Sequence, residues 1–487
     1  MRTLADIVLK IPIKLFIGSL NIPIMAISFD SRKVEPGTLF VAIRGTITDG
    51  HHFLSDVTRR GVSAIVCEEM PASLRNEITY IITKDTSLAL GLICDEFYDR
   101  PSQKLTLIGV TGTNGKTTTA TLLYQLFRTM GYKTGLISTV AYYVDGQRTE
   151  ATHTTPDPVQ LNELMMQMVE HGCDYCFMEV SSHAIVQQRI AGLTFAGGVF
   201  TNLTHDHLDF HKTFAEYLKA KKTFFDHLPD TAFALVNKDD RNGMVMLQNT
   251  KANVKTYAMK SMADFHCRVV ERDFAGMLLQ LDGKEVWMRL IGEFNAYNLL
   301  AVYAVAVLLG QKPEETLTAM SVLTPVDGRF EFIRSANNII AVVDYSHTPD
   351  ALENALKAIQ GILPGKMSHV ITVVGCGGDR DKTKRPEMAK IAVGNSSRVI
   401  FTSDNPRSEE PDAIISDMLA GLDVSERRNV ITITDRREAI RTACMMATPG
   451  DVILVAGKGH ETYQIAKGVK SHFDDREVVR ETFQIEN

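Results

Sequence analysis

The stretch between residues 105 and 130 constrains the fold of this chain more than any other. A short apolar run rich in β-branched residues, 105–110, leads into the glycine-containing segment 111–119, and a helical pattern follows from Ala120 to about Met130. Glycines let backbone N–H groups close around phosphate oxygens, and the N-terminus of the following helix adds the positive end of its dipole. The order of strand, glycine loop and helix therefore predicts a phosphate-binding loop in an α/β protein.

The residues of this loop suit a nucleotide with magnesium. Lys116 would contact the β- and γ-phosphates, and the hydroxyl of Thr117 would bind Mg²⁺. The spacing departs from the ordinary pattern, because Val110 stands where the first glycine is expected and the glycines fall at Gly109 and Gly112. A turn that merely contains glycines is the alternative. The combination of strand, Gly-Thr-Asn-Gly-Lys-Thr-Thr and helix favours the phosphate loop.

Length and charge narrow the class of protein. One hydrophobic core rarely grows past about 250–300 residues, so 487 residues predict about three domains. The formal charge of −6 argues against a nucleic-acid-binding protein, although local basic pockets remain possible. No apolar run reaches the ~18 residues of a membrane span, and we find no signal peptide near the N-terminus.

The cysteines are few and scattered. Seven cysteines, an odd number, fit a reducing cytoplasm. Cys173 and Cys176 form a single Cys-x-x-Cys without a second pair at zinc spacing. Since Cys176 opens an apolar run, we expect a buried core residue, and redox or metal use is the alternative.

Apolar runs alternate with helical patterns along most of the chain. We expect an N-terminal α/β domain over 1–98, a central domain over 99–332 and a C-terminal domain over 333–487, with Arg100-Pro101 near the first boundary. Such alternation predicts parallel sheets covered on both faces, with ligands at the carboxyl ends of the strands. Residues 264–291 alternate polar and apolar side chains, which predicts a small antiparallel sheet.

Polar residues follow the expected strands of the central domain. Glu179 ends one strand, and a carboxylate near a phosphate loop is the expected Mg²⁺ ligand. Asn202 ends the next strand, and histidines 205, 207 and 211 follow it. Their spacing alone would allow zinc, whereas the adjacent phosphate loop favours magnesium with nucleotide.

Three further segments have an ordinary structural interpretation beside a functional one. The basic residues of 217–222 fit a solvated helix face. Asn298 fits a cap for the apolar helix 299–309, although Asn295 one turn earlier makes nucleotide contact plausible. Residues 30–32 fit a turn with a helix cap.

The C-terminal domain repeats the pattern of strand ends. Four expected strands, 339–344, 370–374, 399–402 and 452–456, are each followed by polar residues with glycine or proline. Because all four would point to one sheet edge, we expect a site there. Arg380 and Arg407 suit bidentate capture of a carboxylate.

With these motifs assembled, the chain resembles the Mur ligase family over essentially its whole length. The markers are Thr111-Gly-Thr-Asn-Gly-Lys-Thr117, Glu179-Val-Ser-Ser-His183, Asp206-His-Leu-Asp-Phe-His211, Phe294-Asn295, Gly328-Arg329, Asp344-Tyr-Ser-His-Thr-Pro349, Gly377-Gly-Asp-Arg380, Asp404-Asn-Pro-Arg407 and Gly457-Lys-Gly-His-Glu461. The shifted glycine spacing is itself this family's form. Ser346 departs from the family pattern, in which we expect alanine.

The resemblance implies an α/β fold of three domains: an N-terminal UDP-sugar-binding domain, a central P-loop parallel-sheet ATPase domain and a C-terminal Rossmann-like domain that receives the amino acid. It implies catalytic roles for Lys116, Lys221, His207 and Arg329. The implied ATP contacts are Gly112, Thr113, Asn114, Gly115, Lys116, Thr117, Thr118, Asn295, Arg329 and Asp344. The implied UDP-sugar contacts are Ser31, Thr154, Thr155, Ser181, Gln187 and Arg189.

The metal and amino-acid sites are implied in the same way. Mg²⁺ would be bound by Thr117, Glu179, His207 and Lys221, the last as a carbamate, which turns a cation repelled by magnesium into an anionic ligand. The diaminopimelate contacts would be Arg380, Asp404, Asn405, Pro406, Arg407, Gly457 and Glu461.

The implied activity is that of an ATP-dependent acid–amino-acid (C–N) ligase in cytoplasmic peptidoglycan precursor synthesis, here expected to act as a monomer. ATP would phosphorylate the D-glutamate side-chain carboxylate of UDP-MurNAc-L-Ala-D-Glu, and the amine of meso-diaminopimelate would attack the acyl phosphate. The tetrad Asp404–Arg407 has the form associated with meso-diaminopimelate, because lysine would leave a buried arginine unpaired. Ligation of L-lysine is the nearest alternative.

Three other classes compete with this interpretation. A folylpolyglutamate synthetase-like ligase should lack the tetrad and the N-terminal UDP-binding domain. A P-loop switch or motor would not need the strand-end cluster of 344–461. A zinc hydrolase would be built on histidines 205, 207 and 211.

Overall fold

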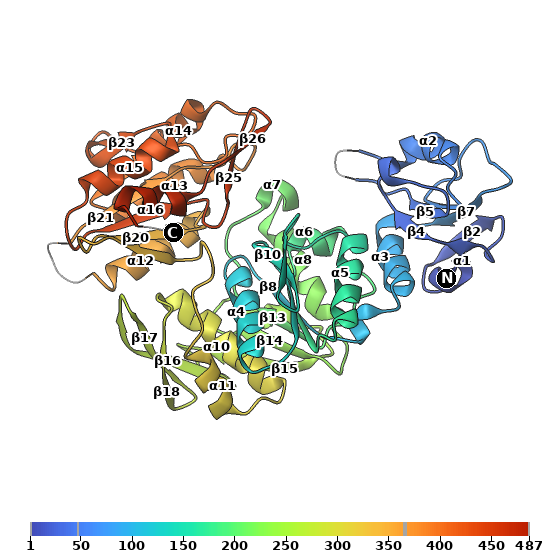
Figure 1. Ribbon diagram of the computed structural model, residues 1–487, viewed down its shortest axis with the longest axis horizontal. Coiled ribbons are helices and arrows are strands. Elements are labelled where there is room, and N and C mark those ends of the chain that lie inside the picture. The colour runs from blue at the N-terminus through green and yellow to red at the C-terminus, as the bar shows by residue number, and fades with distance from the viewer. Residues whose placement is uncertain (1, 46–47, 364–367, 486–487) are drawn as a thin grey trace.

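The computed structural model describes residues 2–45, 48–363 and 368–485. Figure 1 shows three groups of elements, each built on its own sheet: the N-terminal group in blue, the central group from cyan to yellow, and the C-terminal group in orange and red. The three-domain α/β architecture expected from the sequence is confirmed.

The N-terminal group contains a five-stranded sheet of order β2-β7-β6-β5-β4. Strands β4 to β7 run parallel, and β2 pairs antiparallel with β7. Helices α1 and α3 pack on one face of the sheet and α2 on the other. The bounds are β1 Arg2–Thr3, α1 Leu4–Ile7, β2 Ile13–Ile17, β3 Pro23–Ile24, β4 Ala26–Ser28, η1 Ser31–Lys33, β5 Thr38–Val41, η2 Gly50–Phe53, α2 Leu54–Arg59, β6 Ala64–Cys67, β7 Thr79–Thr83 and α3 Thr86–Phe97.

The central group contains an eleven-stranded sheet of order β11-β10-β9-β12-β8-β13-β14-β15-β16-β17-β18. The seven strands in the middle of this order, from β9 through β12 and β8 to β16, pair parallel with one another. The two strands at each edge, β10 and β11 on one side and β17 and β18 on the other, pair antiparallel. Helices α4 and α10 cover one face, and α5 and α8 the other. The strand bounds are β8 Thr106–Thr111, β9 Thr134–Ile137, β10 Ala141–Val144, β11 Gln147–Glu150, β12 Tyr175–Glu179, β13 Gly197–Phe200, β14 Phe233–Asn237, β15 Asn253–Ala258, β16 Phe265–Asp273, β17 Gly276–Leu281 and β18 Lys284–Met288.

One helix and three strands of this group differ from what the sequence suggested. The helices are η3 Pro101–Gln103, α4 Lys116–Thr129, α5 Pro158–Glu170, α6 Ser182–Val186, α7 Leu208–His211, α8 Phe214–Asp226, α9 Gly243–Met246, α10 Glu293–Leu308 and α11 Pro313–Met320. Helix α10 begins at Glu293 with Gly292 as its N-cap, so the interpretation of Asn298 as a helix cap is wrong. The antiparallel strands β16–β18 do form, but they extend the main sheet, since β16 pairs with β15.

The C-terminal group contains a six-stranded sheet of order β19-β20-β24-β21-β22-β23, parallel except for the edge strand β19. Helices α12, α13 and α14 cover one face, and α15 and α16 the other. The bounds are β19 Glu331–Arg334, β20 Ile340–Asp344, α12 Pro349–Gln360, β21 Val370–Val374, α13 Lys384–Asn395, β22 Arg398–Phe401, α14 Pro411–Leu419, η4 Glu426–Asn429, β23 Val430–Thr432, α15 Arg436–Met446, β24 Val452–Ala456, β25 Tyr463–Ala466, β26 Val469–His472 and α16 Asp475–Phe483.

The smaller expectations hold as well. All seven cysteines are free and buried, and burial raises the pKa of the Cys176 thiol, as expected for a core residue. Asp30 caps the short helix η1 through its side chain. Within the described ranges, no helix is both long and apolar enough to cross a membrane.

Candidate active site

A cavity of about 840 Å³ lies where the strand ends of the central and C-terminal sheets meet. It is lined by the phosphate loop after β8, by the segments after β12 and β13, by the start of α10, and by residues following β20 and β21. The carboxyl ends of parallel strands are the usual ligand site of such sheets.

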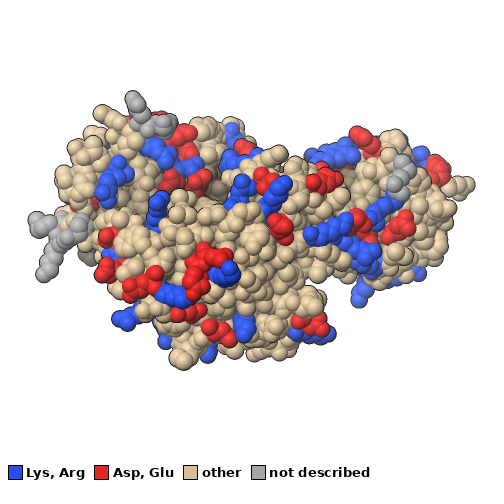
Figure 2. Space-filling model, turned by 60° about the horizontal axis from the view of Figure 1, so that its bottom comes forward, with Lys and Arg blue, Asp and Glu red and all other residues tan. Residues whose placement is uncertain are grey.

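On the face that Figure 2 shows, basic and acidic side chains are interspersed, so this face has no continuous basic surface of the kind that binds nucleic acid.

The glycines of the phosphate loop stand where a side chain would not fit. Gly112 has φ +150°, and a Cβ there would lie 1.9 Å from the hydroxyl of Thr201. Gly115 has φ +87°, and a Cβ there would lie 2.5 Å from the amide oxygen of Asn298. The shifted glycine spacing therefore follows from close approach of the neighbouring strand end and of α10.

Two lysines point into this loop. The ammonium of Lys116 donates to the carbonyl oxygens of Gly112 (3.0 Å) and Thr113 (2.8 Å), and the ammonium of Lys221 donates to the same Gly112 oxygen at 2.7 Å. Burial lowers the pKa of Lys221, and the positive charge of Lys116 lowers it further. The sequence suggested a solvated basic face for 217–222, but Lys221 is only 1% exposed, so that interpretation is wrong for this residue.

The four expected metal ligands, Thr117, Glu179, His207 and Lys221, all line the cavity. One carboxylate oxygen of Glu179, Oε1, accepts the N–H of Thr139 at 2.7 Å. The other, Oε2, is buried without a hydrogen-bond partner among the described residues, which suits a cation ligand. Burial lowers the pKa of His207 to about 3, so its imidazole is neutral and can offer a lone pair.

The zinc alternative is not supported. His211 Nε2 lies 2.9 Å from the hydroxyl of Ser182, and His205 lies beside Asp381. Over the ranges that the structure describes, no three His, Cys, Asp or Glu side chains form a group that could hold a metal ion. The oxygen-rich set around Thr117 and Glu179 suits magnesium better than zinc.

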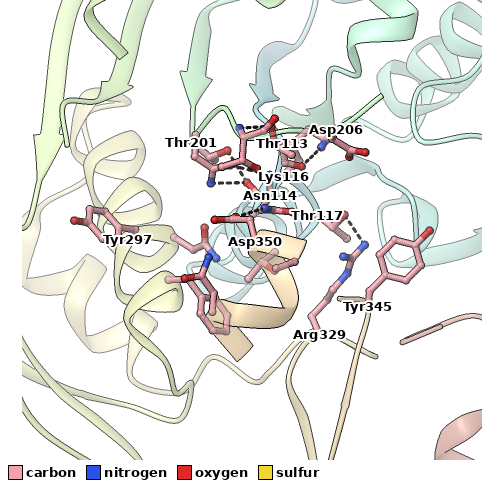
Figure 3. Close-up of a pocket in the computed structure, with 18 of the residues that line it drawn as sticks. Thr113, Asn114, Lys116, Thr117, Thr201, Asp206, Tyr297, Arg329, Tyr345 and Asp350 are labelled. Carbon is pink, nitrogen blue, oxygen red and sulfur yellow. Dashed lines mark hydrogen bonds between the residues drawn. The ribbon is translucent and has the colours of Figure 1, made fainter. Parts of the chain in front are cut away.

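Arg329 crosses the cavity to the phosphate loop (Figure 3). Its Nη2 donates to the hydroxyl of Thr117 at 3.0 Å, and its guanidinium carbon lies 4.3 Å from the centre of the Tyr345 ring. Its Nε is buried without a partner in the described part of the chain. An arginine held in this way still has a donor free to meet a phosphate oxygen.

Two other expected ATP contacts, Asp344 and Asn295, are polar residues that line the cavity. Asp344 accepts the N–H of Phe330 at 3.0 Å and the hydroxyl of Ser346 at 2.7 Å, and burial raises its pKa. The departure at Ser346 therefore has a structural role. Asn298 donates to the side-chain oxygen of Asn295 at 3.1 Å, inside the first turns of α10.

Two contacts between the central and C-terminal groups were not expected from the sequence. Asn114 donates to Asp350 at 2.9 Å (Figure 3), and the ammonium of Lys384 lies 2.5 Å from Asp206 with both side chains largely buried. In the sequence, Asp206 is part of a motif. Asp350 is marked only by its position next to Pro349, and Lys384 only by its position in the segment after Arg380.

The expected UDP-sugar contacts are mostly brought together. Thr154, Thr155, Ser181 and Arg189 line the cavity. Arg189 donates to the carbonyl of Thr155 at 2.6 Å and to the side-chain oxygen of Gln187, which lies beside the cavity. Ser31 lies in η1 of the N-terminal group and does not line the cavity.

The expected amino-acid contacts surround three strand ends of the C-terminal sheet. Asn405 donates to Glu461 at 2.7 Å, and a Cβ on Gly457 would lie 2.6 Å from Asp404. Arg407, held at φ +53°, donates to the carbonyl of Gly378 at 2.7 Å.

Both arginines lie close to Gly377, where a Cβ would be 2.9 Å from Arg407 Nη1 and 3.7 Å from Arg380 Cγ, and Arg380 lines the cavity. The carbonyl of Pro406 lies against Gly378, where a Cβ would come within 1.9 Å of it. The tetrad 404–407 and the loop before Arg380 are thus packed together. Of the residues expected to bind the amino acid, Arg380 lines the cavity and the other six do not.

Comparison with known proteins covers the whole chain. Family models match residues 23–98 (Mur ligase family, catalytic domain), 110–306 (Mur ligase middle domain) and 328–459 (Mur ligase, glutamate ligase domain). A protein of Phocaeicola vulgatus named UDP-N-acetylmuramoyl-L-alanyl-D-glutamate--2,6-diaminopimelate ligase is 58% identical over 480 residues, 99% of each chain. One of Bacteroides thetaiotaomicron with the same name is 59% identical over 466 residues, 96% of each chain.

Solved structures agree with these relatives. A structure of a UDP-N-acetylmuramoyl-L-alanyl-D-glutamate--2,6-diaminopimelate ligase is 31% identical with a TM-score of 0.69, covering 99% of each chain. A folylpolyglutamate synthase of Mycobacterium tuberculosis complexed with ADP and AMPPCP shares the fold at 18% identity and a TM-score of 0.62, and it covers 76% of this chain and 92% of its own.

Proposed function

Because this chain belongs to the Mur ligase family, we propose that it is the ATP-dependent ligase that joins meso-diaminopimelate to the D-glutamate side-chain carboxylate of UDP-MurNAc-L-Ala-D-Glu. The observation that best supports this proposal is that one cavity brings together the phosphate loop, the expected UDP-sugar contacts and an expected amino-acid contact. The UDP-sugar contacts there are Thr154, Thr155, Ser181 and Arg189, and the amino-acid contact is Arg380. Relatives that match 96–99% of this chain are named for this reaction.

The reaction proceeds through an activated carboxylate. A carboxylate oxygen of the D-glutamate side chain attacks the γ-phosphorus of ATP, and ADP leaves. The amine of the incoming amino acid then attacks the carbonyl carbon of the acyl phosphate, and inorganic phosphate leaves from the tetrahedral intermediate. Because water would hydrolyse the acyl phosphate, ligation would be favoured if the two groups of elements that line the cavity closed over it and excluded water.

Lys116 and Arg329 stabilise the negative charge on the transferred phosphoryl group. Lys116 holds two loop carbonyls in the structure, and phosphate oxygens would replace these as its partners. Arg329 also has a buried Nε without a hydrogen-bond partner among the described residues. Such preorganised positive groups are the main source of catalysis in phosphoryl transfer. The remaining ATP contacts are assigned to Gly112, Thr113, Asn114, Gly115, Thr117, Thr118, Asn295 and Asp344.

We assign the magnesium site to Thr117, Glu179, His207 and Lys221. A magnesium ion bound there would neutralise phosphate charge. The free oxygen of Glu179 and the neutral imidazole of His207 fit this role.

Lys221 completes the set as a carbamate. Its pKa is lowered by burial and by Lys116, which favours the neutral amine that attacks CO₂. The amine nitrogen bonds to the carbon of CO₂ and releases one proton, and an anionic carbamate replaces the ammonium. That exchange removes a repulsion between two buried cations that share the Gly112 carbonyl.

The UDP-sugar substrate is assigned to Ser31, Thr154, Thr155, Ser181, Gln187 and Arg189. Ser31 is placed by a separate group of elements, so the sugar nucleotide would extend from the cavity to the N-terminal sheet. We further propose three domains with limits near 1–98, 99–332 and 333–487. Because β19 begins at Glu331 and pairs with β20, the second limit belongs before Glu331. A cytoplasmic monomer is the expected form of the enzyme.

The incoming amino acid is assigned to Arg380, Asp404, Asn405, Pro406, Arg407, Gly457 and Glu461. Arg380 and Arg407 would bind the distal carboxylate of meso-diaminopimelate, and Glu461 the distal ammonium. L-lysine lacks that carboxylate and would leave the arginines without a partner. A site built for a polar group rejects an analogue that lacks it by a factor of up to ~10⁴–10⁵.

The decisive experiment measures phosphate release by the purified protein with ATP, Mg²⁺ and UDP-MurNAc-L-Ala-D-Glu. Either meso-diaminopimelate or L-lysine is added, and the product mass is determined. We expect phosphate and a tripeptide product with meso-diaminopimelate alone. A lysine product would overturn the assignment of residues 404–407, and no product with either would contradict the proposed substrate.

A further inference from the structure

We propose that Lys458 is a positioning residue that holds Glu461 and Asn405 in place and thereby sets which amino acid the site accepts. The inference rests on the proposed function, since it concerns the residues assigned to the incoming amino acid. Lys458 directly follows the glycine after β24 and is 0% exposed. A lysine buried so completely needs partners for its charge.

Both polar partners of Lys458 belong to the assigned amino-acid site. Its Nζ lies 3.2 Å from Glu461 Oε2 and 3.3 Å from the side-chain oxygen of Asn405. The face of Tyr463 lies 5.5 Å from the same nitrogen. The ammonium thus connects a residue after β22 with one after β24, and it reaches both without contact with solvent.

These bonds orient the amide of Asn405. Its oxygen accepts the N–H of Ile465 at 2.9 Å in addition to Lys458, so its nitrogen must point the other way. That nitrogen donates to Glu461 Oε2 at 2.7 Å. Glu461 Oε2 therefore has two donors, whereas among the described residues Oε1 has only the hydroxyl of Tyr345 at 3.5 Å. One carboxylate oxygen is left for a ligand.

The charges decide what such a site prefers. Lys458 neutralises Glu461, and Asp404, Arg380 and Arg407 are the other charged residues assigned to this site. The buried Arg436 also lies near Asp404 and Glu461, but it is paired with Asp475 at 2.7 Å. Asp404 already accepts the N–H of Asn405 at 2.6 Å. A side chain that ends in an ammonium alone therefore meets a neutralised carboxylate and two arginines. A side chain that ends in both an ammonium and a carboxylate satisfies Glu461 Oε1 and the arginines together.

Removal of the Lys458 charge should weaken this preference. In Lys458→Met the carboxylate of Glu461 loses its neutralising partner and becomes a stronger site for a lone ammonium. We expect KM for meso-diaminopimelate to rise about tenfold, with kcat changed less than about threefold, because the effect is on binding of one substrate. The ratio of kcat/KM for meso-diaminopimelate to that for L-lysine should fall about tenfold or more. KM for ATP should not change.

Two variants complete the test. Lys458→Arg keeps the charge and should retain most of the selectivity. Lys470→Met is the matched control, because Lys470 also lies over the Tyr463 ring, at 4.0 Å, but is solvent-exposed. It should behave as the wild type. If Lys458→Met does not fold, Lys458→Gln, which keeps a donor without the charge, should show the same direction of selectivity change.

The outcomes separate this inference from the proposed function. If the wild type forms no tripeptide with either amino acid, the proposed function itself has failed. If the wild type ligates meso-diaminopimelate and the neutral variants keep both its KM and its selectivity over L-lysine, the positioning role of Lys458 is overturned. An equal loss with both amino acids at unchanged KM would also overturn it.

Discussion

Arg329 Nη2 donates a 3.0 Å hydrogen bond to the hydroxyl of Thr117, although 212 residues separate them in the chain. Arg329 lies between α11 and β19, and Thr117 lies in the first turn of α4. The contact therefore connects the start of the C-terminal sheet to the phosphate loop. Because Thr117 is also an assigned magnesium ligand, the arginine stands next to the position of the transferred phosphoryl group.

Replacement of Arg329 by alanine should slow the chemical step. A positive group that stabilises charge in the transition state is worth about 10²–10³ in kcat. We expect a decrease of that order for Arg329→Ala, with KM for ATP changed much less, and a partial recovery in Arg329→Lys. Steady-state phosphate release measures both. A large rise in KM for ATP with unchanged kcat would instead assign Arg329 to ground-state binding.

Activity should depend on CO₂ if Lys221 is carbamylated. We expect Lys221→Ala to be inactive and partly rescued by small carboxylic acids, and the wild type to lose activity reversibly when bicarbonate is removed. Lys222→Ala is the matched control, because Lys222 lies next along α8 and pairs with Asp226 at 2.6 Å. It should keep its activity. Bicarbonate-independent activity of the wild type would contradict the modification.

Loss of the Arg407 side chain should affect the amino acid alone. Arg407→Ala removes one guanidinium of the assigned carboxylate site, and loss of a charge-paired contact costs about 10²-fold or more in kcat/KM. We expect such a loss for meso-diaminopimelate, while ATP binding measured by calorimetry is unchanged. Arg441→Ala, which removes an arginine paired with Glu438 on the surface of α15, is the control. Full activity of Arg407→Ala would refute the assignment.

Acid should destabilise the protein partly through His460. Burial lowers its pKa to about 3, compared with about 6.5 in an unfolded chain. Between these values the unfolded state binds more protons, so the free energy of unfolding falls as the pH falls from about 6.5 towards about 3. His460→Gln should lose less stability than the wild type between pH 7 and about pH 5, as measured by urea unfolding. The same slope in both proteins would refute this contribution.

Much of the fold was accessible from local pattern. The strands Val370–Val374 and Val452–Ala456 were predicted to the residue, since a short apolar run between turn residues has few other structures. The start of α10 was missed, because Glu293, Phe294 and Asn295 lack a strong capping signal and Gly292 serves as the cap. Helix ends depend on one or two residues and are the least certain part of such predictions.

The residues of the candidate site also differ in how far local sequence predicts them. The phosphate loop, the carboxylate at Glu179 and the polar strand ends can be predicted from local sequence, because each depends on residues within one strand, turn and helix. The three-dimensional arrangement is needed to show that Lys221 is buried against Gly112, that Lys384 reaches Asp206, and that Lys458 contacts Asn405 and Glu461. Most of these contacts join residues far apart in the chain. They depend on the order in which strands enter the sheets and on how two sheets meet, and neither is encoded in the spacing of any one motif.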